Sequence, residues 1–426
     1  MDTEASCESD DGMSGSGRGA VLKEEMKQME AGYNAIAQAI ELRRSKGLPL
    51  HDLSRVDPIG VLPSFSAELL IEASRRYFLN RDYQADPQGS GEARRTISEW
   101  YHVNHQLELT PERIIITAST SESYQLLLQS LCSPGSTILV PSPSYPLLDE
   151  FALQRGVSTR GVPLRRHAQW RYAPQSFEGF LDQSVAAVVL VSPNNPTGTI
   201  VGADELIAII NLLQALPYRP PLIIDEVFAQ ALHGEERTCH YLAMETDYPV
   251  ILLNGISKSF CAPDLKVGWM GLNEAAWRQY GNTLVYANDL LLSCSGLSQS
   301  LMVAMMREGG HYQATVNESL ALRYRRTLEL LGERHWLRVS SPQGGWMAMA
   351  ELVPDGHRRS TVGNDEQFFE CAAKEGVVLH PGYFYGVNEP GLWGAFSLLS
   401  DEHVLVGGLD ILEELLTERF VGAPDR

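Results

Sequence analysis

Short apolar runs alternate with stretches of helical periodicity from about residue 113 onward, and few folds accommodate such an alternation. The runs are rich in β-branched residues, so we expect strands that are buried on both faces. Ser121–Leu131 and Ala203–Leu216 show helical spacing, and Pro217 ends the second of them. Buried strands joined through helices indicate a mostly parallel sheet covered on both sides. The predicted strands are Arg113–Thr117, Thr137–Pro141, Ala186–Val191, Leu222–Asp225, Val250–Leu253 and Val267–Gly271.

The two ends of the chain follow a different pattern. Val21–Arg44 has helical spacing, and a long helical pattern runs from Leu297 to about Arg334. A strand-like run at Trp346–Leu352 and a helix near Glu402–Arg419 come later. We therefore predict an α/β fold, with a large domain around a mostly parallel sheet and a small α+β domain built from both chain ends. The predicted segments are a disordered tail at 1–20, an N-terminal helix and arm at 21–75, the large domain at 76–305 and the C-terminal part of the small domain at 306–426.

Composition excludes several classes of function. The 426 residues carry a net charge of −19, which disfavours a nucleic-acid partner. No apolar run is long enough to span a bilayer, so we expect no membrane association. The acidic, Ser- and Gly-rich start lacks the features of a signal peptide. The six cysteines form no CxxC pair, so zinc and disulfide frameworks are unsupported, and we expect a cytoplasmic protein with reduced thiols and no bound metal.

Ligands bind at the carboxyl ends of strands in open α/β sheets, so the residues that follow each apolar run are candidates for a site. Thr117–Ser121 follows the first run and opens a helix. Its hydroxyls and the free N–H groups of a helix N-terminus suit a phosphate. A simple N-cap explains the same residues, and from this segment alone it is the more common outcome.

Three further strand ends carry polar residues. Ser192–Gly198 is a Pro- and Asn-rich loop, which is often only a turn. Asp225 and Glu226 end a buried strand, where a carboxylate needs a partner. A salt bridge or a helix cap would meet that need, and so would a protonated pyridine nitrogen. Lys258 follows an apolar strand among small residues. Most lysines are surface residues, but burial there lowers the pKa and makes the amine a nucleophile toward a carbonyl.

The order of these four segments resembles that of fold-type I enzymes that use pyridoxal 5′-phosphate (PLP). From about Leu50 to the C-terminus the chain is similar to the class I/II aminotransferase family. Ser192–Gly198 resembles the family's NPxNPTG loop, with Ser192 in place of the first Asn. Gly255–Gly268 resembles its SxSKxxxxxGxRxG-type lysine segment, with Asp264 at the first Gly. The resemblance implies an aspartate-aminotransferase-like fold.

The resemblance also implies roles for individual residues. Lys258 would hold PLP as an internal aldimine and, through a quinonoid intermediate, move a proton of the substrate. Asp225 would pair with the pyridinium nitrogen, and Asn195 would donate a hydrogen bond to the phenolic oxygen. Asn195-Pro196 is a candidate cis peptide bond, and Tyr145 would stack on the cofactor ring. The phosphate would be held by Ser119, Thr120, Ser121, Ser257 and Lys266.

Tyr83 looks like the family tyrosine that reaches the phosphate of the neighbouring subunit, which implies a homodimer with shared active sites. Ordinary packing explains Tyr83 equally well. The chain also departs from the family pattern at three positions. Lys266 replaces an Arg beside the phosphate, Phe228 replaces the Tyr of Asp-x-x-Tyr, and Ala395 replaces the Arg that binds the substrate α-carboxylate.

Two residues are candidates to contact the substrate in place of the missing arginine. Arg55 lies in the loop near Pro58 and supplies a cation. His380 belongs to a segment that matches the family's PG loop, although a structural hydrogen bond accounts for it as well.

The implied function is an aminotransferase that acts on an amino acid or a similar amine. The alternative is a specialised biosynthetic PLP enzyme that catalyses elimination, replacement, cyclisation or carbon–carbon bond formation, for example on S-adenosylmethionine or an arginine-like substrate. These activities share the same machinery, so the sequence does not separate them. A non-catalytic regulator on this scaffold is a third possibility, which the presence of Lys258 and Asp225 disfavours.

Overall fold

The computed structural model describes residues 35–81, 85–234, 237–292, 294–353 and 365–418. Its large sheet has the strand order β2-β8-β7-β6-β5-β3-β4. Within this sheet β8 is antiparallel to both of its neighbours, whereas the other described pairs are parallel. The mostly parallel sheet of the prediction is therefore confirmed. The strands are β2 (Ile114–Thr117), β3 (Thr137–Ser142), β4 (Ser158–Pro163), β5 (Val185–Val191), β6 (Leu222–Asp225), β7 (Val250–Gly255) and β8 (Gly268–Leu272).

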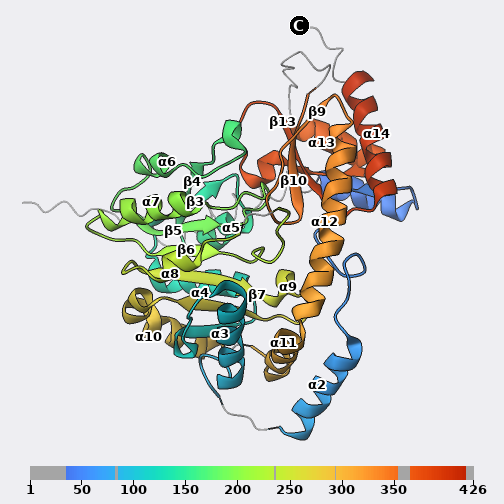
Figure 1. Ribbon diagram of the computed structural model, residues 1–426. Helices are drawn as coiled ribbons and strands as arrows, with labels where there is room; N and C mark the ends of the chain where they lie inside the picture. Colours follow the sequence, from blue (N-terminus) through green and yellow to red (C-terminus); the bar gives the residue numbers. More distant parts are fainter. Residues whose placement is uncertain (1–34, 82–84, 235–236, 293, 354–364, 419–426) are drawn as a thin grey trace, which may run out of the picture.

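Helices cover both faces of this sheet (Figure 1). Successive side chains of a strand point to opposite faces, so each strand feeds two cores. Ile223 of β6 packs with helices on one face, whereas Leu222 and Ile224 pack with those on the other. The first face holds α4 (Thr120–Leu131), α5 (Leu147–Gln154) and α10 (Glu274–Leu291), and the second holds α3 (Gly91–His105), α6 (Pro174–Glu178), α7 (Ala203–Gln214), α8 (Tyr241–Met244) and α11 (Gly296–Glu308).

A second, smaller domain lies around a four-stranded sheet with the order β12-β13-β10-β9. Its core combines Ile36 and Leu53 from the N-terminal part with Phe368 and Leu409 from the C-terminal part. A parallel pair, β1 with β11, joins the two chain ends directly. The small domain is thus built from both ends, as the sequence predicts. Its elements are β1 (His51–Asp52), β9 (Leu337–Val339), β10 (Met347–Leu352), α13 (Asp365–Glu375), β11 (Val377–Val378), β12 (His380–Pro381), η3 (Gly382–Tyr385), β13 (Leu392–Ser397) and α14 (Glu402–Glu418).

One long helix, α12 (Gly310–Gly332), runs from the large domain to the small one (Figure 1). The sequence predicts a single helical stretch here, but the structure divides it between α11 and α12 at Gly309. Residues 35–45 are helical, and the earlier part of the predicted Val21–Arg44 helix lies outside the described residues, as does the tail. β4 is absent from the prediction because its exposed edge position needs no apolar run.

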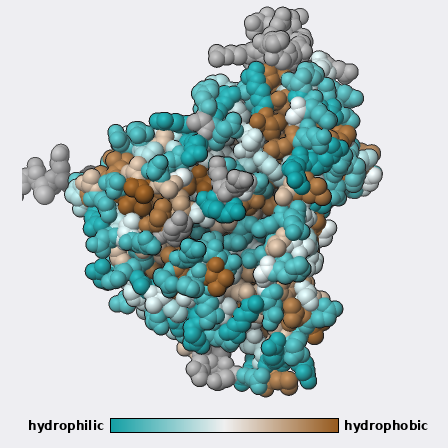
Figure 2. Space-filling view, viewed as in Figure 1, coloured by the Kyte–Doolittle hydropathy of each residue, from teal (hydrophilic) through white to brown (hydrophobic). Residues whose placement is uncertain are grey.

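The surface seen in Figure 2 is mostly hydrophilic, with hydrophobic side chains in small groups. Within the described ranges, no helix combines the length and the apolar character that crossing a bilayer requires.

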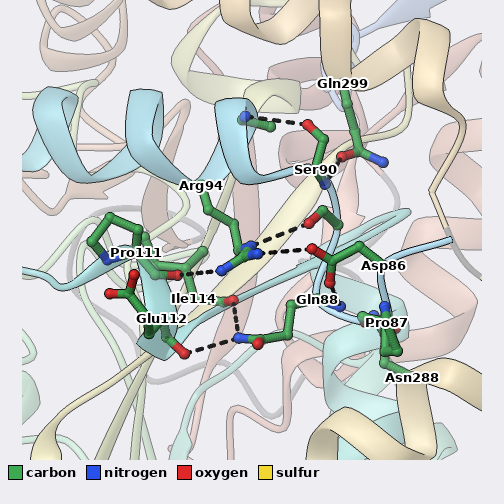
Figure 3. Close-up of polar contacts among 12 residues, drawn as sticks. Asp86, Pro87, Gln88, Ser90, Arg94, Pro111, Glu112, Ile114, Asn288 and Gln299 are labelled. Carbon is green, nitrogen blue, oxygen red and sulfur yellow. Dashed lines mark hydrogen bonds and ion pairs between the residues drawn. The ribbon is translucent and has the colours of Figure 1, made fainter. Parts of the chain in front are cut away.

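A network of polar contacts anchors the loop segment 86–90, which follows α2 (Ala67–Leu79) along the chain and directly precedes α3 (Figure 3). Arg94 of α3 forms an ion pair with Asp86 at 2.8 Å. The buried Asn288 of α10 donates to the carbonyls of Pro87 (2.6 Å) and Ile116 (3.0 Å). The loop is therefore fixed against β2, the strand whose end leads into the predicted phosphate segment.

Candidate active site

A pocket of about 1120 Å³ lies at the carboxyl ends of the large-sheet strands and is closed on its other side by the small domain. β10, β12 and η3 contribute to the small-domain wall, with side chains that include Trp346, Met347 and Tyr385. The pocket brings together most of the site residues that the sequence predicts. These are Ser119, Thr120, Ser121, Tyr145, Asn195, Asp225, Ser257, Lys258, Lys266 and His380. Tyr83 lies outside the described residues, and Arg55 is not among the lining residues.

Lys258 occupies the short helix α9 (Ile256–Ser259), which begins directly after β7. Its Nζ lies 4.5 Å from the centre of the Trp346 ring and 5.8 Å from that of Phe228. The same atom donates to the carbonyl of Val56 at 3.4 Å. Because burial disfavours the charged ammonium, the pKa of Lys258 is lowered to about 8. The free amine is therefore far more abundant at neutral pH than it is for a surface lysine.

The start of α9 depends on Gly255. A Cβ at this position would lie 2.8 Å from the carbonyl oxygen of Val267, closer than side-chain carbons come to backbone. β7 and β8 therefore approach closely at this point, and the chain turns from strand to helix where Lys258 enters the pocket.

Asp225 is the last residue of β6 and Glu226 follows it, but the two carboxylates have different neighbours. Asp225 lines the pocket, and burial raises its pKa to about 6. Glu226 forms an ion pair with the buried His240 at 2.9 Å and accepts hydrogen bonds from Tyr101 (2.5 Å) and Asn254 (3.1 Å). The salt-bridge alternative therefore describes Glu226, whereas the carboxylate available to the pocket is that of Asp225.

Asn195 reaches the pocket from the loop between β5 and α7. The peptide bond Asn195-Pro196 is cis, as predicted, and Ser192-Pro193 is cis as well. Among the described residues the Asn195 Oδ1 is buried without a hydrogen-bond partner. Gly198 completes the loop at φ +70°, where a Cβ would lie 2.2 Å from Pro342 Cβ. The tight loop therefore fixes the backbone on both sides of an amide that has unused hydrogen-bonding capacity.

The hydroxyl-bearing segment Thr117–Ser121 lies at the N-terminus of α4. Ser119 is the N-cap, and its Oγ accepts from the N–H of Glu122 at 3.1 Å, so the capping alternative also holds. A Cβ on Gly268 would lie 2.7 Å from the carbonyl carbon of Ser119, so this glycine lets β8 approach the helix end. Ser257 and Lys266 line the same pocket. Hydroxyls, helix N–H groups and an ammonium thus converge on one end of it.

The small-domain side of the pocket lacks the arginine that the family pattern would place near it. Ala395 is fully buried in β13, between His380 of β12 and Met349 of β10. No arginine is among the lining residues in the described part of the chain. The guanidinium of Arg55 instead donates to the carbonyls of Asp57 (3.2 Å) and Ile59 (2.8 Å) in its own loop.

His380 lines the pocket and has a structural partner as well. Its Nδ1 lies 2.8 Å from the hydroxyl oxygen of Tyr385, and burial lowers the pKa of the imidazole. The ring is therefore mostly neutral at pH 7. A neutral imidazole is a poor substitute for an arginine that binds a carboxylate.

Sequence reasoning missed two residues that line the pocket. Tyr124 of α4 donates from its Oη to Oδ2 of Asp225 at 2.9 Å. Its position one turn after Thr120 was the available signal, because helix residues three to four apart share a face. Trp346 directly precedes β10, and its ring faces Lys258. In the sequence Trp346 begins an apolar run, which predicts only a place in the core.

Comparison with known proteins gives a consistent picture. The model of the family Aminotransferase class I and II matches residues 76–405. A probable aminotransferase of Arabidopsis thaliana, TAT1, is 28% identical over 230 residues, which cover 53% of this chain and 50% of that protein. The S-alkyl-thiohydroximate lyase SUR1 of the same plant is 30% identical over 182 residues, which cover 43% and 39%. The chain thus matches about half of the length of these curated relatives, or less.

Solved structures extend the likeness over nearly the whole fold. An alanine aminotransferase from Pyrococcus furiosus matches with a TM-score of 0.80 at 22% identity, covering 90% of this chain and 96% of that one. At this identity the match concerns the fold alone. The family model, in contrast, covers the greater part of the sequence and includes every pocket residue named above from Ser119 to Tyr385. The chain therefore belongs to the class I and II aminotransferase family.

Proposed function

We propose that the chain is a PLP-dependent aminotransferase that acts on an amino acid or a similar amine. The observation that carries this proposal is the convergence of Lys258, Asp225 and Asn195 on one pocket. A partly buried amine, a buried carboxylate and an amide oxygen that is buried without a partner are costly for a protein that does not use them.

The residues present fit PLP. The Asn195 amide has an unpaired buried oxygen, and an amide rotated by half a turn would offer its N–H₂ to a ligand oxygen instead. Asp225 supplies negative charge for a protonated ring nitrogen. The N-terminus of α4, with Ser257 and Lys266, supplies donors and positive charge for a phosphate.

Each residue has a definite task in this proposal. Bound PLP would supply an electron sink for the negative charge that develops at the substrate Cα. Lys258 would take a proton from the substrate Cα and return one, and its lowered pKa suits proton transfer near neutral pH. Asp225 would retain the proton on the ring nitrogen, and the small-domain wall would exclude water from the reacting atoms.

A specialised biosynthetic PLP enzyme is the second candidate. Ala395 favours it, because a missing carboxylate-binding arginine suits a substrate unlike an ordinary α-amino acid. The likeness to a lyase, SUR1, points the same way. Both functions rest on the same three pocket residues.

A homodimer is part of the proposal. Large apolar side chains are exposed on α2, where Ile71 and Phe78 are 68% and 58% exposed, and at the end of α10, where Leu290 is 61% exposed. Ile71 and Phe78 are seven positions apart, so they lie on one face of α2. Exposed apolar side chains on one helix face favour an interface with a second copy of the chain. Light scattering that gives a monomer mass at micromolar concentration would contradict it.

The direct test begins with the purified chain and PLP. We expect a visible absorbance band, and borohydride should fix the cofactor to Lys258, as peptide mass spectrometry would show. The rate at which PLP attaches to Lys258 should rise with pH and level off above about 8, because only the neutral amine reacts. Addition of amino donors should then convert PLP to pyridoxamine phosphate and release a keto acid.

Two outcomes decide between the alternatives. Consumption of an amine without formation of pyridoxamine phosphate would replace the aminotransferase by the specialised enzyme, whether or not a keto acid is released. A colourless protein with no borohydride adduct at Lys258 would overturn both.

A further inference from the structure

Tyr124 joins the helix of the proposed phosphate site to the carboxylate of the proposed ring-nitrogen site. Its Oη donates to Oδ2 of Asp225 at 2.9 Å, and its side chain is only 3% exposed. The ring stacks on Phe151 of α5 at a centroid distance of 6.3 Å and an interplanar angle of 26°. Packing therefore fixes the ring, so the direction of the hydroxyl is set by the fold.

Three hydrogen bonds from the protein hold Asp225 in place. Oδ1 accepts from the N–H of Val227 at 3.0 Å, and Oδ2 accepts from Tyr124. Its backbone carbonyl accepts from the N–H of Ser192 at 2.9 Å. Each carboxylate oxygen thus has one protein donor, and each oxygen retains a lone pair for a ligand.

The two side-chain hydrogen bonds act against burial. Desolvation raises the pKa of Asp225, and the bonds from Val227 and Tyr124 lower it because they favour the charged carboxylate. The pKa of the Tyr124 hydroxyl is itself raised well above its ordinary value by burial and by Asp225, so the phenol remains a donor at working pH. The Tyr124 phenol therefore helps, together with the Val227 N–H, to keep Asp225 in its charged form.

Other charged and titratable groups surround the pair. Glu226 lies behind the strand end and raises the pKa of Asp225, whereas its partner His240 lowers it. Tyr145 and Tyr172 lie near Tyr124, and both influence its pKa. Lys258, Lys266 and the carboxylates Asp149, Glu150 and Glu366 belong to the same pocket. Of these groups, Tyr124 donates a side-chain hydrogen bond to Asp225.

We propose that Tyr124 is a positioning residue that keeps Asp225 ionised and aimed at the ring nitrogen of the cofactor. This inference rests on the proposed function. Thr120 and Ser121 lie one turn earlier on the same helix, so α4 would fix the phosphate end directly and the nitrogen end through Asp225. A single rigid element thereby sets the orientation of the ring in the pocket.

The predicted consequence concerns one proton. Between a pyridine nitrogen and a carboxylate the proton resides either on nitrogen, with both groups charged, or on oxygen, with both neutral. A hydrogen bond to the carboxylate favours the charged arrangement. Loss of this bond should shift the equilibrium toward the neutral arrangement by about tenfold or more, since hydrogen bonds to charged groups are among the stronger ones.

The test uses the holoenzyme with PLP labelled with ¹⁵N in the ring. In wild type we expect the nitrogen resonance at the protonated position, and Asp225→Asn gives the position without the carboxylate. Tyr124→Phe should move the resonance a measurable part of the way toward Asp225→Asn. Tyr172→Phe is the matched control, because Tyr172 is also buried but bonds the backbone of Val191. It should leave the resonance at the wild-type position.

The outcomes separate this inference from the proposed function. A Tyr124→Phe protein that binds PLP on Lys258 and keeps the wild-type resonance would overturn the role of Tyr124 and leave the function intact. Failure of wild type to bind PLP at all would overturn both.

A second readout needs no cofactor. The tyrosine bond is strongest when Asp225 is ionised, so its contribution to stability should appear as pH rises through about 6 and disappear below. We expect Tyr124→Phe to lower the urea midpoint more at pH 8 than at pH 5. In an Asp225→Asn background this pH dependence should vanish. An equal loss at both pH values would show that the hydroxyl is merely structural.

Discussion

The two ends of the pocket differ in how they are built. At the end where β5, β6 and β7 finish, three polar groups line the pocket: Lys258 with a lowered pKa, Asp225 with a raised pKa and Asn195 with an unpaired oxygen. At the end provided by β10, β12 and η3, the wall is mostly aromatic and apolar, and the neighbouring strand β13 has Ala395 at the position of the expected arginine. In the proposed function the first end would hold the cofactor, and the second lacks the arginine that would bind an ordinary α-amino acid.

This difference separates polar groups that need a chemical use from side chains that pack. Burial of the polar groups is costly unless chemistry uses them. The apolar end stabilises the small domain whatever the substrate is, because Trp346 and Phe228 pack edge to face at 5.5 Å. Substitutions at the two ends should therefore have different signatures.

The largest expected effect is that of Lys258→Ala. Removal of the amine should abolish the borohydride adduct and lower turnover by about 10³-fold or more, since both the cofactor link and the proton transfer depend on it. Lys266→Ala is the matched control, because it removes an ammonium from the same pocket. It should weaken PLP binding yet retain the adduct. If peptide mapping finds that an adduct persists in Lys258→Ala, the reactive amine belongs to another residue. The contrast between the two ends of the pocket would then be wrong.

Ala395→Arg tests the opposite end. The site is fully buried between two strands, so a guanidinium without a carboxylate partner should lower the free energy of unfolding by about 2–4 kcal/mol. Ala395→Met adds volume without charge and should cost about 1–2 kcal/mol. Urea unfolding of the two variants measures the difference. An Arg variant as stable as wild type that also binds a simple carboxylate more tightly would show that the end still has room for the usual clamp.

Much of this contrast could be predicted from the sequence, and the rest could not for identifiable reasons. Apolar runs gave the positions of six strands, because strands buried on both faces require them. The exposed edge strand β4 has no such requirement and was missed. Lys258 and Asp225 were found because polar residues directly after apolar strands are rare. Tyr124 was missed because a tyrosine on a helix is usually core, and only the packing against Phe151 directs its hydroxyl to Asp225.

Phe228→Tyr would sharpen the comparison at the boundary of the two ends. Phe228 is 7% exposed and lies beside Lys258. A hydroxyl there should donate to the phenolic oxygen of the cofactor in its charged form, and a bond of this kind changes a pKa by about one unit. The pH midpoint of the visible band should therefore be about one unit lower in Phe228→Tyr than in wild type. Phe228→Leu, which has no hydroxyl, should show no such decrease. Identical midpoints in wild type and Phe228→Tyr would contradict the inference that a hydroxyl at position 228 reaches the phenolic oxygen of the cofactor.

His380→Gln should have a smaller effect, confined to acid. Burial lowers the pKa of His380, so the unfolded chain binds more protons than the folded one below about pH 6.5. Wild-type stability should therefore fall as pH drops through this range. Glutamine retains a partner for Tyr385 without titrating, so the two proteins should agree at pH 8 to within about 0.5 kcal/mol. At pH 5 the variant should have lost less stability, as urea midpoints at the two pH values would show.

Arg55→Ala should have the smallest effect of all. The guanidinium donates to two carbonyls of its own exposed loop, and its side chain is not part of the pocket wall. Hydrogen bonds at an exposed site contribute little, so we expect a loss of about 1 kcal/mol or less and a KM within about twofold of wild type. Arg44→Ala, on the exposed surface of the N-terminal helix, gives the baseline for a removed arginine. A tenfold or larger increase in KM for Arg55→Ala alone, with kcat unchanged, would mean that substrate draws this loop inward. The apolar end would then contain a carboxylate clamp after all, supplied by a different element of the fold from the β13 position that Ala395 occupies.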